Sequence, residues 1–240
     1  MSEKKFSKEQ AIKFGWQRTK DNLGFFIVYL IIVFAVEFFF SFFIELFDEA
    51  GFLTLSVLFN LGSFVVSIVV SIFGIKIGLR LYENEKIGSY DFLSFSLSTF
   101  FKYLLAYLLF FIIIVVGFIL LIVPGIYLAI RYQFCLYLII DKDMDVIDSF
   151  KESTRLTDGS KWNLFVFALL QILIVLAGIL ALLVGLFVAV PIVIVSWAYV
   201  YKMLSSATPN AASSTASPPQ MPQTTQPQGD NPFMPPSASS

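Results

Sequence analysis

Long uncharged apolar runs, separated by short polar segments, dominate the chain from residue 24 to residue 204. A helix needs about 20 residues, with a range of roughly 17 to 25, to cross the hydrocarbon core of a bilayer. The apolar runs therefore predict six transmembrane helices. Their expected bounds are about 24–47, 52–81, 100–123, 126–140, 162–190 and 191–204.

Proline and glycine mark the expected turns. Pro124 and Gly125 predict a tight turn between the third and fourth spans. Pro191 is expected to open the sixth span. The alternative is an earlier turn, near Gly178 to Gly185, which would leave Pro191 inside the helix as a kink.

Basic residues gather at alternating ends of the predicted spans. They occur in the N-terminal segment, around the connections after the second and fourth spans, and at Lys202, whereas the three opposite turns hold none. The positive-inside rule then predicts that both termini are cytoplasmic. The first apolar run is too long for the core of a signal peptide, so we expect it to stay as the first span in the cytoplasmic membrane.

Residues 205–240 differ in character from the rest of the chain. They contain eight of the ten prolines, many Ser, Gln and Thr residues, and no Lys or Arg. Such a segment cannot bury enough apolar surface to offset the entropy lost on ordering. We expect a disordered cytoplasmic tail after a transmembrane domain of residues 1–204.

The composition narrows the chemistry open to the chain. Hydrophobic residues make up 58% and charged residues 14% of the chain, and the mean hydropathy is +0.82. A soluble domain usually carries about 25% charged residues. The chain has no histidine, Cys135 is its single cysteine, and no phosphate-binding or nucleophile motif occurs. We therefore expect no enzymatic activity, no cofactor and, with a net charge of −1, no nucleic-acid partner.

Three segments lead into odd-numbered spans in the same way: 11–30, 90–109 and 149–170. Each has a short semi-polar helical stretch, a polar break and then an apolar run. Such lead-in helices are either interfacial, with basic residues toward lipid phosphates, or ordinary connecting helices. The expected architecture is an all-α polytopic membrane protein of three helical hairpins, each preceded by a short interfacial helix.

The stretch "VPGIYLAIRYQFCLYLIIDKDMDVIDSFKESTRLTDGSKWNLF" (123–165) resembles a family of uncharacterised bacterial and archaeal integral membrane proteins. That family is related to the membrane domain of glycerophosphodiester phosphodiesterases. The resemblance covers about residues 90–205 and does not include the phosphodiesterase catalytic domain, so it implies no enzymatic activity. The matching positions are Pro124, Gly125, Arg131, Asp141, Ser149, Lys151, Ser153, Leu156, Gly159 and Trp162.

Alternating carboxylates at Asp141, Asp143 and Asp145 form a weak candidate for a site that binds a hard cation. The glycine and glutamate that complete an EF-hand loop are missing. Helix capping by Asp143 or Asp145 is the favoured interpretation, because negative charge is stabilising near a helix N-terminus.

Small residues in the second span predict close helix packing. Gly74 and Gly78 are four residues apart, as are Ser63, Ser67 and Ser71. Small side chains at this spacing let two membrane helices approach each other. A serine-lined pathway is the alternative.

Polar residues inside the predicted spans form the main candidate site. At 1.5 Å per residue, Glu37 and Arg131 come to about 10 Å, and Asn60 to about 12 Å, from the outer edge of a ~30 Å core. Tyr127 and Gln133 lie on neighbouring turns. An unpaired charge at this depth costs at least ~2.5 kcal/mol, so a Glu37–Arg131 pair supported by Asn60 is predicted. The layer either fixes helix register or binds a small anion or lipid headgroup, unless Arg131 reaches the outer headgroups instead.

Two functions follow from this sequence. The first is a non-enzymatic membrane protein that interacts with lipid, senses it or scaffolds a partner. The alternative is a small-solute or lipid transporter, or permease subunit, that uses the layer of Glu37 and Arg131. The expected partners are membrane lipids, and a second copy of the chain or another membrane protein is the further candidate.

Overall fold

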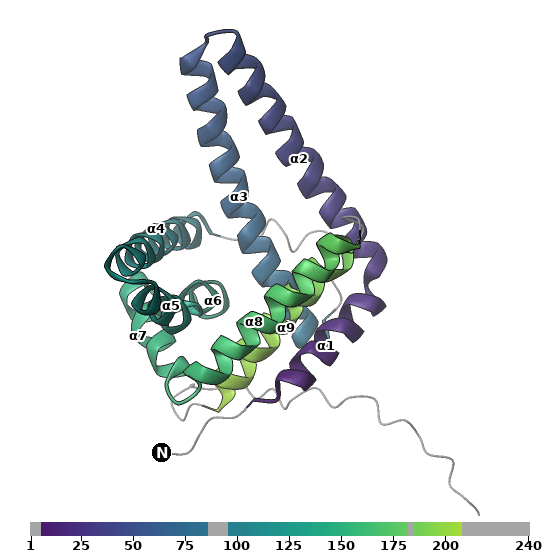
Figure 1. Ribbon diagram of the computed structural model, residues 1–240, viewed down its shortest axis with the longest axis vertical. Helices are drawn as coiled ribbons and strands as arrows, with labels where there is room; N and C mark the ends of the chain where they lie inside the picture. Colours follow the sequence, from purple (N-terminus) through teal and green to yellow (C-terminus); the bar gives the residue numbers. More distant parts are fainter. Residues whose placement is uncertain (1–5, 86–95, 182–184, 208–240) are drawn as a thin grey trace, which may run out of the picture.

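The computed structural model describes residues 6–85, 96–181 and 185–207. All regular elements in these ranges are helices, which confirms the all-α prediction (Figure 1). The helices are α1 (Lys8–Asp21), α2 (Leu23–Glu49), α3 (Leu53–Tyr82), α4 (Leu97–Leu120), α5 (Ile122–Tyr132), α6 (Cys135–Lys142), α7 (Val146–Thr157), α8 (Lys161–Leu180) and α9 (Leu186–Ser206).

Six segments of the described chain are long and apolar enough to cross a membrane, and α5 and α6 together count as one of them, Ile122–Lys142. Their length and composition suggest a multi-pass membrane protein. Residues 208–240 of the predicted tail and the first six residues of the second lead-in segment, 90–95, lie outside the described residues.

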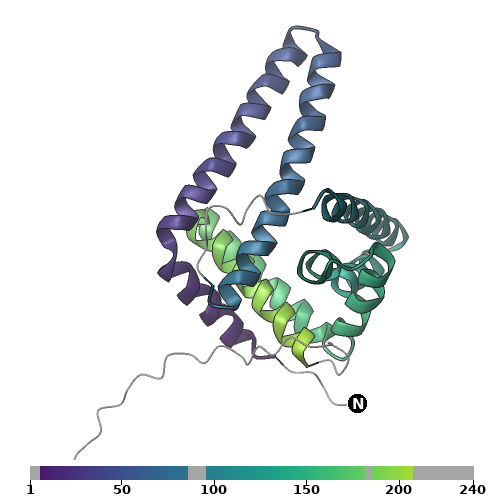
Figure 2. The same ribbon diagram turned by 180° about the vertical axis from the view of Figure 1, so that it is seen from behind.

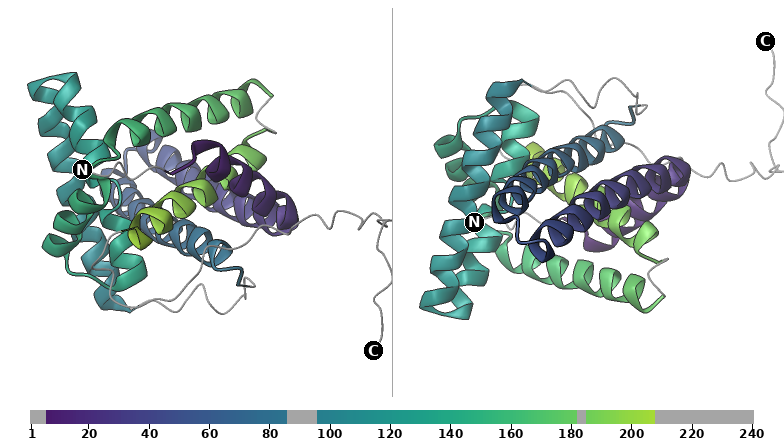
Figure 3. Two further views of the ribbon diagram at one scale, coloured as in Figure 1. Left: turned by 90° about the horizontal axis from the view of Figure 1, so that it is seen from below. Right: turned by 90° about the horizontal axis from the view of Figure 1, so that it is seen from above.

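The three predicted hairpins are α2/α3, α4 with α5, and α8/α9. They diverge from a shared base and do not form one parallel bundle (Figures 1 and 2). The α2/α3 hairpin rises alone, whereas α4 and α5 point nearly along the view of Figure 1 and α8/α9 crosses below them. Seen from above or below, helices α4 to α7 gather on one side of the molecule (Figure 3). The hairpin arms therefore expose apolar side chains, such as Phe34 at 71% and Ile119 at 77%.

The base of the molecule holds the packed core. One buried cluster joins α1, α3, α6, α8 and α9 around Phe134, Phe167 and Tyr201, and a second joins α3, α4, α6 and α7 around Tyr103. These large side chains are at most 1% exposed. Burying aromatic rings of this size is a major source of stability, so the base holds the splayed hairpins together.

The turn between α4 and α5 lies three residues before the predicted Pro124–Gly125 turn. Leu121, with φ −171° and ψ 153°, is the single extended residue between the two helices. Pro124 is the third residue of α5, where its missing amide hydrogen costs nothing because first-turn amides have no helical partner. Gly125 lies in the following position and packs against the ring of Phe118. Both residues therefore begin the next helix and do not form the turn.

The predicted boundary between residues 190 and 191 is wrong, and the earlier alternative is right. Helix α8 ends at Leu180, and Pro191 lies inside α9. A Cβ atom built on Gly185 would stand 2.6 Å from the carbonyl oxygen of Gly178. Because only glycine permits this approach of two backbones, the chain reverses at these glycines and not at the proline.

The two described lead-in helices pack against the hairpins. Ala11, Gly15 and Thr19 of α1 are buried, and α1 lies along α9. Ser149, Ser153 and Thr157 of α7 are also buried, and α7 lies against α5 and α6. In both helices the buried small residues are spaced by four, so each helix presents one narrow face to a neighbouring hairpin.

Candidate functional site

The fourth predicted span is interrupted at Gln133 and Phe134, between α5 and α6. The backbone N–H of Phe134 donates to Ser153 Oγ at 3.2 Å, and Ser153 Oγ donates to the carbonyl of Arg131 at 3.0 Å. Thr157 Oγ1 donates to the same carbonyl at 3.3 Å. Breaks in membrane helices are tolerated where Ser or Thr side chains satisfy the freed backbone groups. Helix α7 thus determines where the chain breaks and where Arg131 lies.

The Arg131 side chain turns toward α7. Its Nε donates to Thr154 Oγ1 at 3.2 Å, and its guanidinium carbon lies 5.6 Å from the ring centre of Tyr132. None of the ion pairs in residues 6–85, 96–181 and 185–207 includes Arg131. The terminal nitrogens of the guanidinium group are therefore not matched by a carboxylate in this part of the chain.

A pocket of about 420 Å³ opens beside Arg131. Its polar wall carries a guanidinium, an ammonium and a hydroxyl group, and the rest of its lining is mostly apolar. A site of this kind suits an anionic amphiphile: the cations would bind its charged group and the apolar wall its tail. The lining residues are Leu109 and Ile113 of α4, Arg131 and Tyr132 of α5, and Ile147, Phe150, Lys151 and Thr154 of α7.

The neighbouring lysines differ from Arg131 because each has a carboxylate partner. Lys151 pairs with Asp148 at 3.1 Å, with side chains 72% and 60% exposed. Lys161 pairs with Asp158 at 3.2 Å and donates to Tyr127 Oη at 3.1 Å. Exposed pairs of this kind contribute little and exchange readily. Lys151 is thus free to change partner for an anion in the pocket.

The predicted Glu37–Arg131 pair is not among the ion pairs of the described residues. Glu37 accepts a hydrogen bond from Ser67 Oγ at 2.9 Å, within the α2/α3 hairpin. Asn60 Nδ2 donates at 2.9 Å to the carbonyl of Ser56 in its own helix. The depth estimate assumed parallel hairpins, whereas the α4/α5 hairpin diverges from α2/α3 (Figure 1). The transporter alternative loses the direct Glu37–Arg131 pair and stays a prediction.

Tyr127 and Gln133 are the other two members of the predicted polar cluster, and neither hydrogen-bonds to Glu37 in the described part of the chain. Tyr127 accepts from Lys161, and its ring centre lies 5.1 Å from the Lys161 ammonium. The side-chain nitrogen of Gln133 is buried and has no hydrogen-bond partner among the described residues. Both residues lie close to Arg131 along the chain, Tyr127 one helical turn before it and Gln133 two residues after it.

A charge exchange tests the separation of Glu37 from Arg131. In the Glu37→Arg/Arg131→Glu protein, the two new side chains do not meet each other, so the exchange restores no pair. We therefore expect the yield of monodisperse protein in detergent to stay at or below that of the weaker single variant. Size-exclusion chromatography of both single variants and the double variant measures this. A double variant that recovers toward the wild-type yield would contradict the arrangement.

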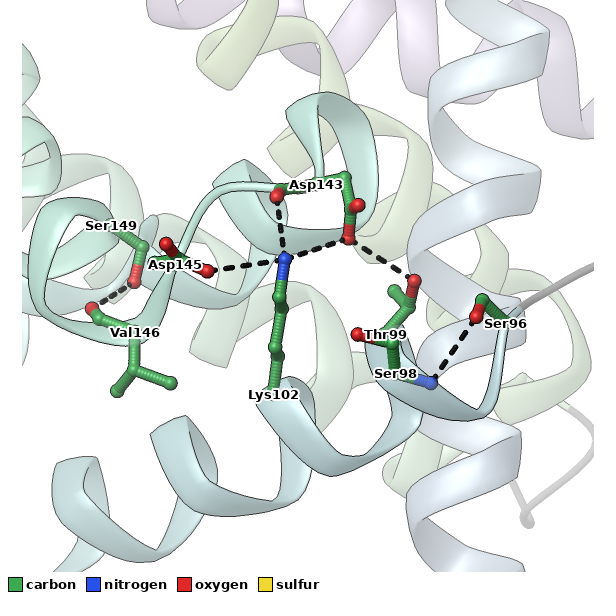
Figure 4. Close-up of polar contacts among 8 residues, drawn as sticks. All are labelled: Ser96, Ser98, Thr99, Lys102, Asp143, Asp145, Val146 and Ser149. Carbon is green, nitrogen blue, oxygen red and sulfur yellow. Dashed lines mark hydrogen bonds and ion pairs between the residues drawn. The ribbon is translucent and has the colours of Figure 1, made fainter.

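The candidate metal ligands are engaged by cations and a tyrosine. Lys102 of α4 lies between Asp143 and Asp145, at 3.4 Å and 3.2 Å from their carboxylates (Figure 4). Asp145 occupies the N-cap position of α7, but its side chain makes no capping hydrogen bond. Asp141 bonds to Tyr201 and Lys202. In the described part of the chain, no three acidic or cysteine side chains are grouped to hold a metal ion.

The small residues of α3 divide into two groups. A Cβ atom on Gly78 would lie 2.9 Å from the Cβ of Ala198, whereas one on Gly74 would find its nearest neighbour at 3.8 Å. Ser67 bonds to Glu37, and Ser71 Oγ donates to the Ser67 carbonyl. Gly78 therefore marks the close contact with α9, while Ser67 and Ser71 satisfy polar groups of their own hairpin. Ser63 is half-buried in the same helix.

Sequence reasoning missed two buried polar features. Lys202 Nζ contacts Asp141 Oδ1 and Glu83 Oε1, both at 2.7 Å, which joins α9, α6 and the end of α3. Gln171 of α8 is 3% exposed, and neither polar atom of its side chain has a partner among the described residues. Gln171 has a signal in the sequence, because it is the single amide within an apolar run. The pairing of Lys202 with Asp141 and Glu83 has none, because that pairing depends on which hairpin ends meet.

Comparison with known proteins gives a family without an assigned role. Neither the curated proteins nor the solved structures include a match to this chain. Residues 90–227, which contain the Arg131 pocket, match a family described as a domain of unknown function. The match covers more than half of the chain, so the protein belongs to this family, DUF7847.

Proposed function

We propose that the protein is a non-enzymatic, lipid-interacting membrane protein that binds the headgroup of an anionic phospholipid in the Arg131 pocket. The observation that carries this proposal is the guanidinium of Arg131, which has no carboxylate partner among the described residues and faces a pocket shared with Lys151. A half-buried cation without a counter-ion is costly unless an anion joins it.

The groups in the pocket suit a phosphodiester. A guanidinium binds phosphate oxygens through two parallel N–H donors, and Lys151 would add a point charge. Arg131 Nε donates to Thr154 Oγ1 at 3.2 Å, and no carboxylate of the described residues pairs with the terminal nitrogens, so these nitrogens would bind the ligand. Leu109, Ile113 and Ile147 offer the apolar wall along which an acyl chain would lie.

The placement of the protein in the membrane belongs to the same proposal. Both termini and the pocket would lie on the cytoplasmic side of the cell membrane, because the basic residues gather at those ends of the hairpins. Membrane lipids are the proposed partners, and association with a second copy or with another membrane protein is compatible with the exposed hairpin arms. The relation to the membrane domain of glycerophosphodiester phosphodiesterases is proposed on the residues that match between 123 and 165.

Lipid binding by matched variants tests the proposal. The full-length protein in nanodiscs of phosphatidylcholine with phosphatidylglycerol should retain phosphatidylglycerol in native mass spectrometry. Loss of a charge-assisted contact, about 1.5–3 kcal/mol, predicts binding at least roughly tenfold weaker in Arg131→Ala. Arg131→Lys should be intermediate, because it keeps the charge and loses the planar fork.

Lys142→Ala is the matched control. It removes an exposed positive charge at the end of α6, outside the residues that line the pocket. It should therefore bind phosphatidylglycerol like the wild type. Equal retention of the lipid by Arg131→Ala and Lys142→Ala would refute the proposal.

A further inference from the structure

A second basic pocket, of about 640 Å³, lies between α1 and the α8/α9 hairpin. One side carries two lysines, a glutamine and a tryptophan from α1. The opposite side is apolar and belongs to α8 and α9. The lining residues are Ile12, Lys13, Trp16, Gln17, Lys20, Ile174, Ala177 and Ile192.

The two pockets are related by the internal repeat. When the buried residues Ala11 and Gly15 of α1 are aligned with Ser149 and Ser153 of α7, Lys13 falls on Lys151. The same alignment places Ile12 on Phe150 and Trp16 on Thr154. In each of these three aligned pairs, the residue of α1 lines the second pocket and the residue of α7 lines the Arg131 pocket. Each lead-in helix thus presents equivalent positions to a hairpin of another repeat.

The packing of α1 on α9 fixes which side of α1 faces the pocket. Ser196 Oγ donates to the carbonyl of Ala11 at 3.1 Å, and a Cβ atom on Gly15 would stand 2.2 Å from Ser196 Oγ. With this face held against α9, Lys13, Gln17 and Lys20 project from successive turns along one edge of the pocket. The close contact therefore presents the polar side chains of α1 next to the apolar surface of α8.

The cations on this edge are available to an incoming anion. Lys13 pairs at 2.6 Å with Glu9, and the two side chains are 66% and 75% exposed. The bond to Lys13 lowers the pKa of Glu9, so the pair is charged at neutral pH, yet it is solvated and exchangeable. Lys20 takes part in none of the ion pairs of the described residues.

We propose that this pocket holds a second anionic phospholipid. Its phosphate would bind Lys13, Gln17 and Lys20, and its acyl chain would lie along Ile174 and Ala177. The occupant is a lipid because the apolar wall continues into side chains of α8 that already face outward, such as Leu173 at 60% exposed. Trp16, 54% exposed beside the lysines, stands where an indole favours the headgroup level. The class of ligand, an anionic phospholipid, rests on the proposed function, whereas the residues that would bind it differ from those of the Arg131 pocket.

Counting bound lipids separates the two sites. In nanodiscs that contain phosphatidylglycerol, the full-length wild type should retain two molecules in native mass spectrometry. Lys13→Ala/Lys20→Ala and Arg131→Ala should each retain one, and the protein with all three substitutions none. Lys8→Ala, which removes a charge of α1 outside the pocket, is the matched control and should retain two.

A second variant leaves the charges of α1 unchanged. Ala177→Phe fills the apolar wall from an exposed position on α8, so it should exclude the acyl chain and also reduce the count to one. If both Lys13→Ala/Lys20→Ala and Ala177→Phe retain two lipids, this second site is refuted. The lipid site proposed at Arg131 is not affected by that result. If the number of retained lipids rises to two only after removal of residues 208–240, the tail and not a lipid occupies the pocket. If the protein is a dimer without the second lipid, a second copy occupies it. Either result would overturn the proposal.

Discussion

The Lys202→Met protein should unfold at a markedly lower temperature than the wild type. Lys202 Nζ bridges Asp141 and Glu83 at 2.7 Å each, and Tyr201 Oη donates to Asp141 at 2.8 Å. The side chains of Lys202 and Asp141 are 14% and 16% exposed. Removing the cation leaves two carboxylates without their partner at the junction of three helices. Breaking a buried pair costs about 3–5 kcal/mol, so about 2–3 kcal/mol is expected for this partly exposed one.

The midpoint of thermal unfolding in detergent, followed by size-exclusion chromatography, measures this effect. Lys151→Met is the matched control, because its ion pair with Asp148 is exposed and should contribute less than about 0.5 kcal/mol. Adding Asp141→Asn and Glu83→Gln to Lys202→Met should recover part of the loss, since the uncompensated charges disappear. If Lys202→Met and Lys151→Met unfold together, the bridge does not stabilise the fold.

Gly78→Ala should destabilise the contact between α3 and α9, and Gly74→Ala should not. The added methyl group at Gly78 would meet the Cβ of Ala198 at 2.9 Å and the carbonyl oxygen of Ile194 at 3.0 Å. Backbone cannot move aside like a flexible side chain, and overpacking of this kind costs about 1–3 kcal/mol. At Gly74 the same methyl group finds its nearest atom at 3.8 Å, an ordinary contact.

The same unfolding assay compares these two glycine variants one helical turn apart. Alanine favours a helix over glycine by roughly 1 kcal/mol, so Gly74→Ala should match or exceed the stability of the wild type. Gly78→Ala should fall below both. The reverse order would mean that α9 does not approach α3 at Gly78.

Which segments become apolar helices was predictable from the sequence. The bounds of α2 and α3 lie within two residues of the predicted spans at 24–47 and 52–81. The turns were harder to predict, because a proline serves equally well in the first turn of a helix, as Pro124 does, or inside one, as Pro191 does. Deciding between these uses requires the contacts across the hairpin, such as the approach of Gly178 and Gly185.

The importance of Arg131 was also visible in the sequence, but its surroundings were not. A cation among apolar residues needs a partner or an anion, whatever the fold. Counting residues along parallel spans placed Glu37 opposite it, whereas Arg131 contacts Thr154 on a helix of the next repeat. The lead-in helix α7, which lies outside the predicted spans, thus supplies the hydrogen-bond partner of Arg131.

The amino-acid sequence was sufficient to predict an all-α protein with six membrane-length apolar segments and one isolated arginine. These properties depend only on how many consecutive residues are apolar and where a charge interrupts them, and neither depends on how the helices pack. The divergence of the hairpins, the packing of α1 and α7 on neighbouring repeats, and the two basic pockets became apparent in the three-dimensional structure. These features depend on close contacts between residues far apart in the chain, such as Gly15 with Ser196 and Ser153 with Arg131.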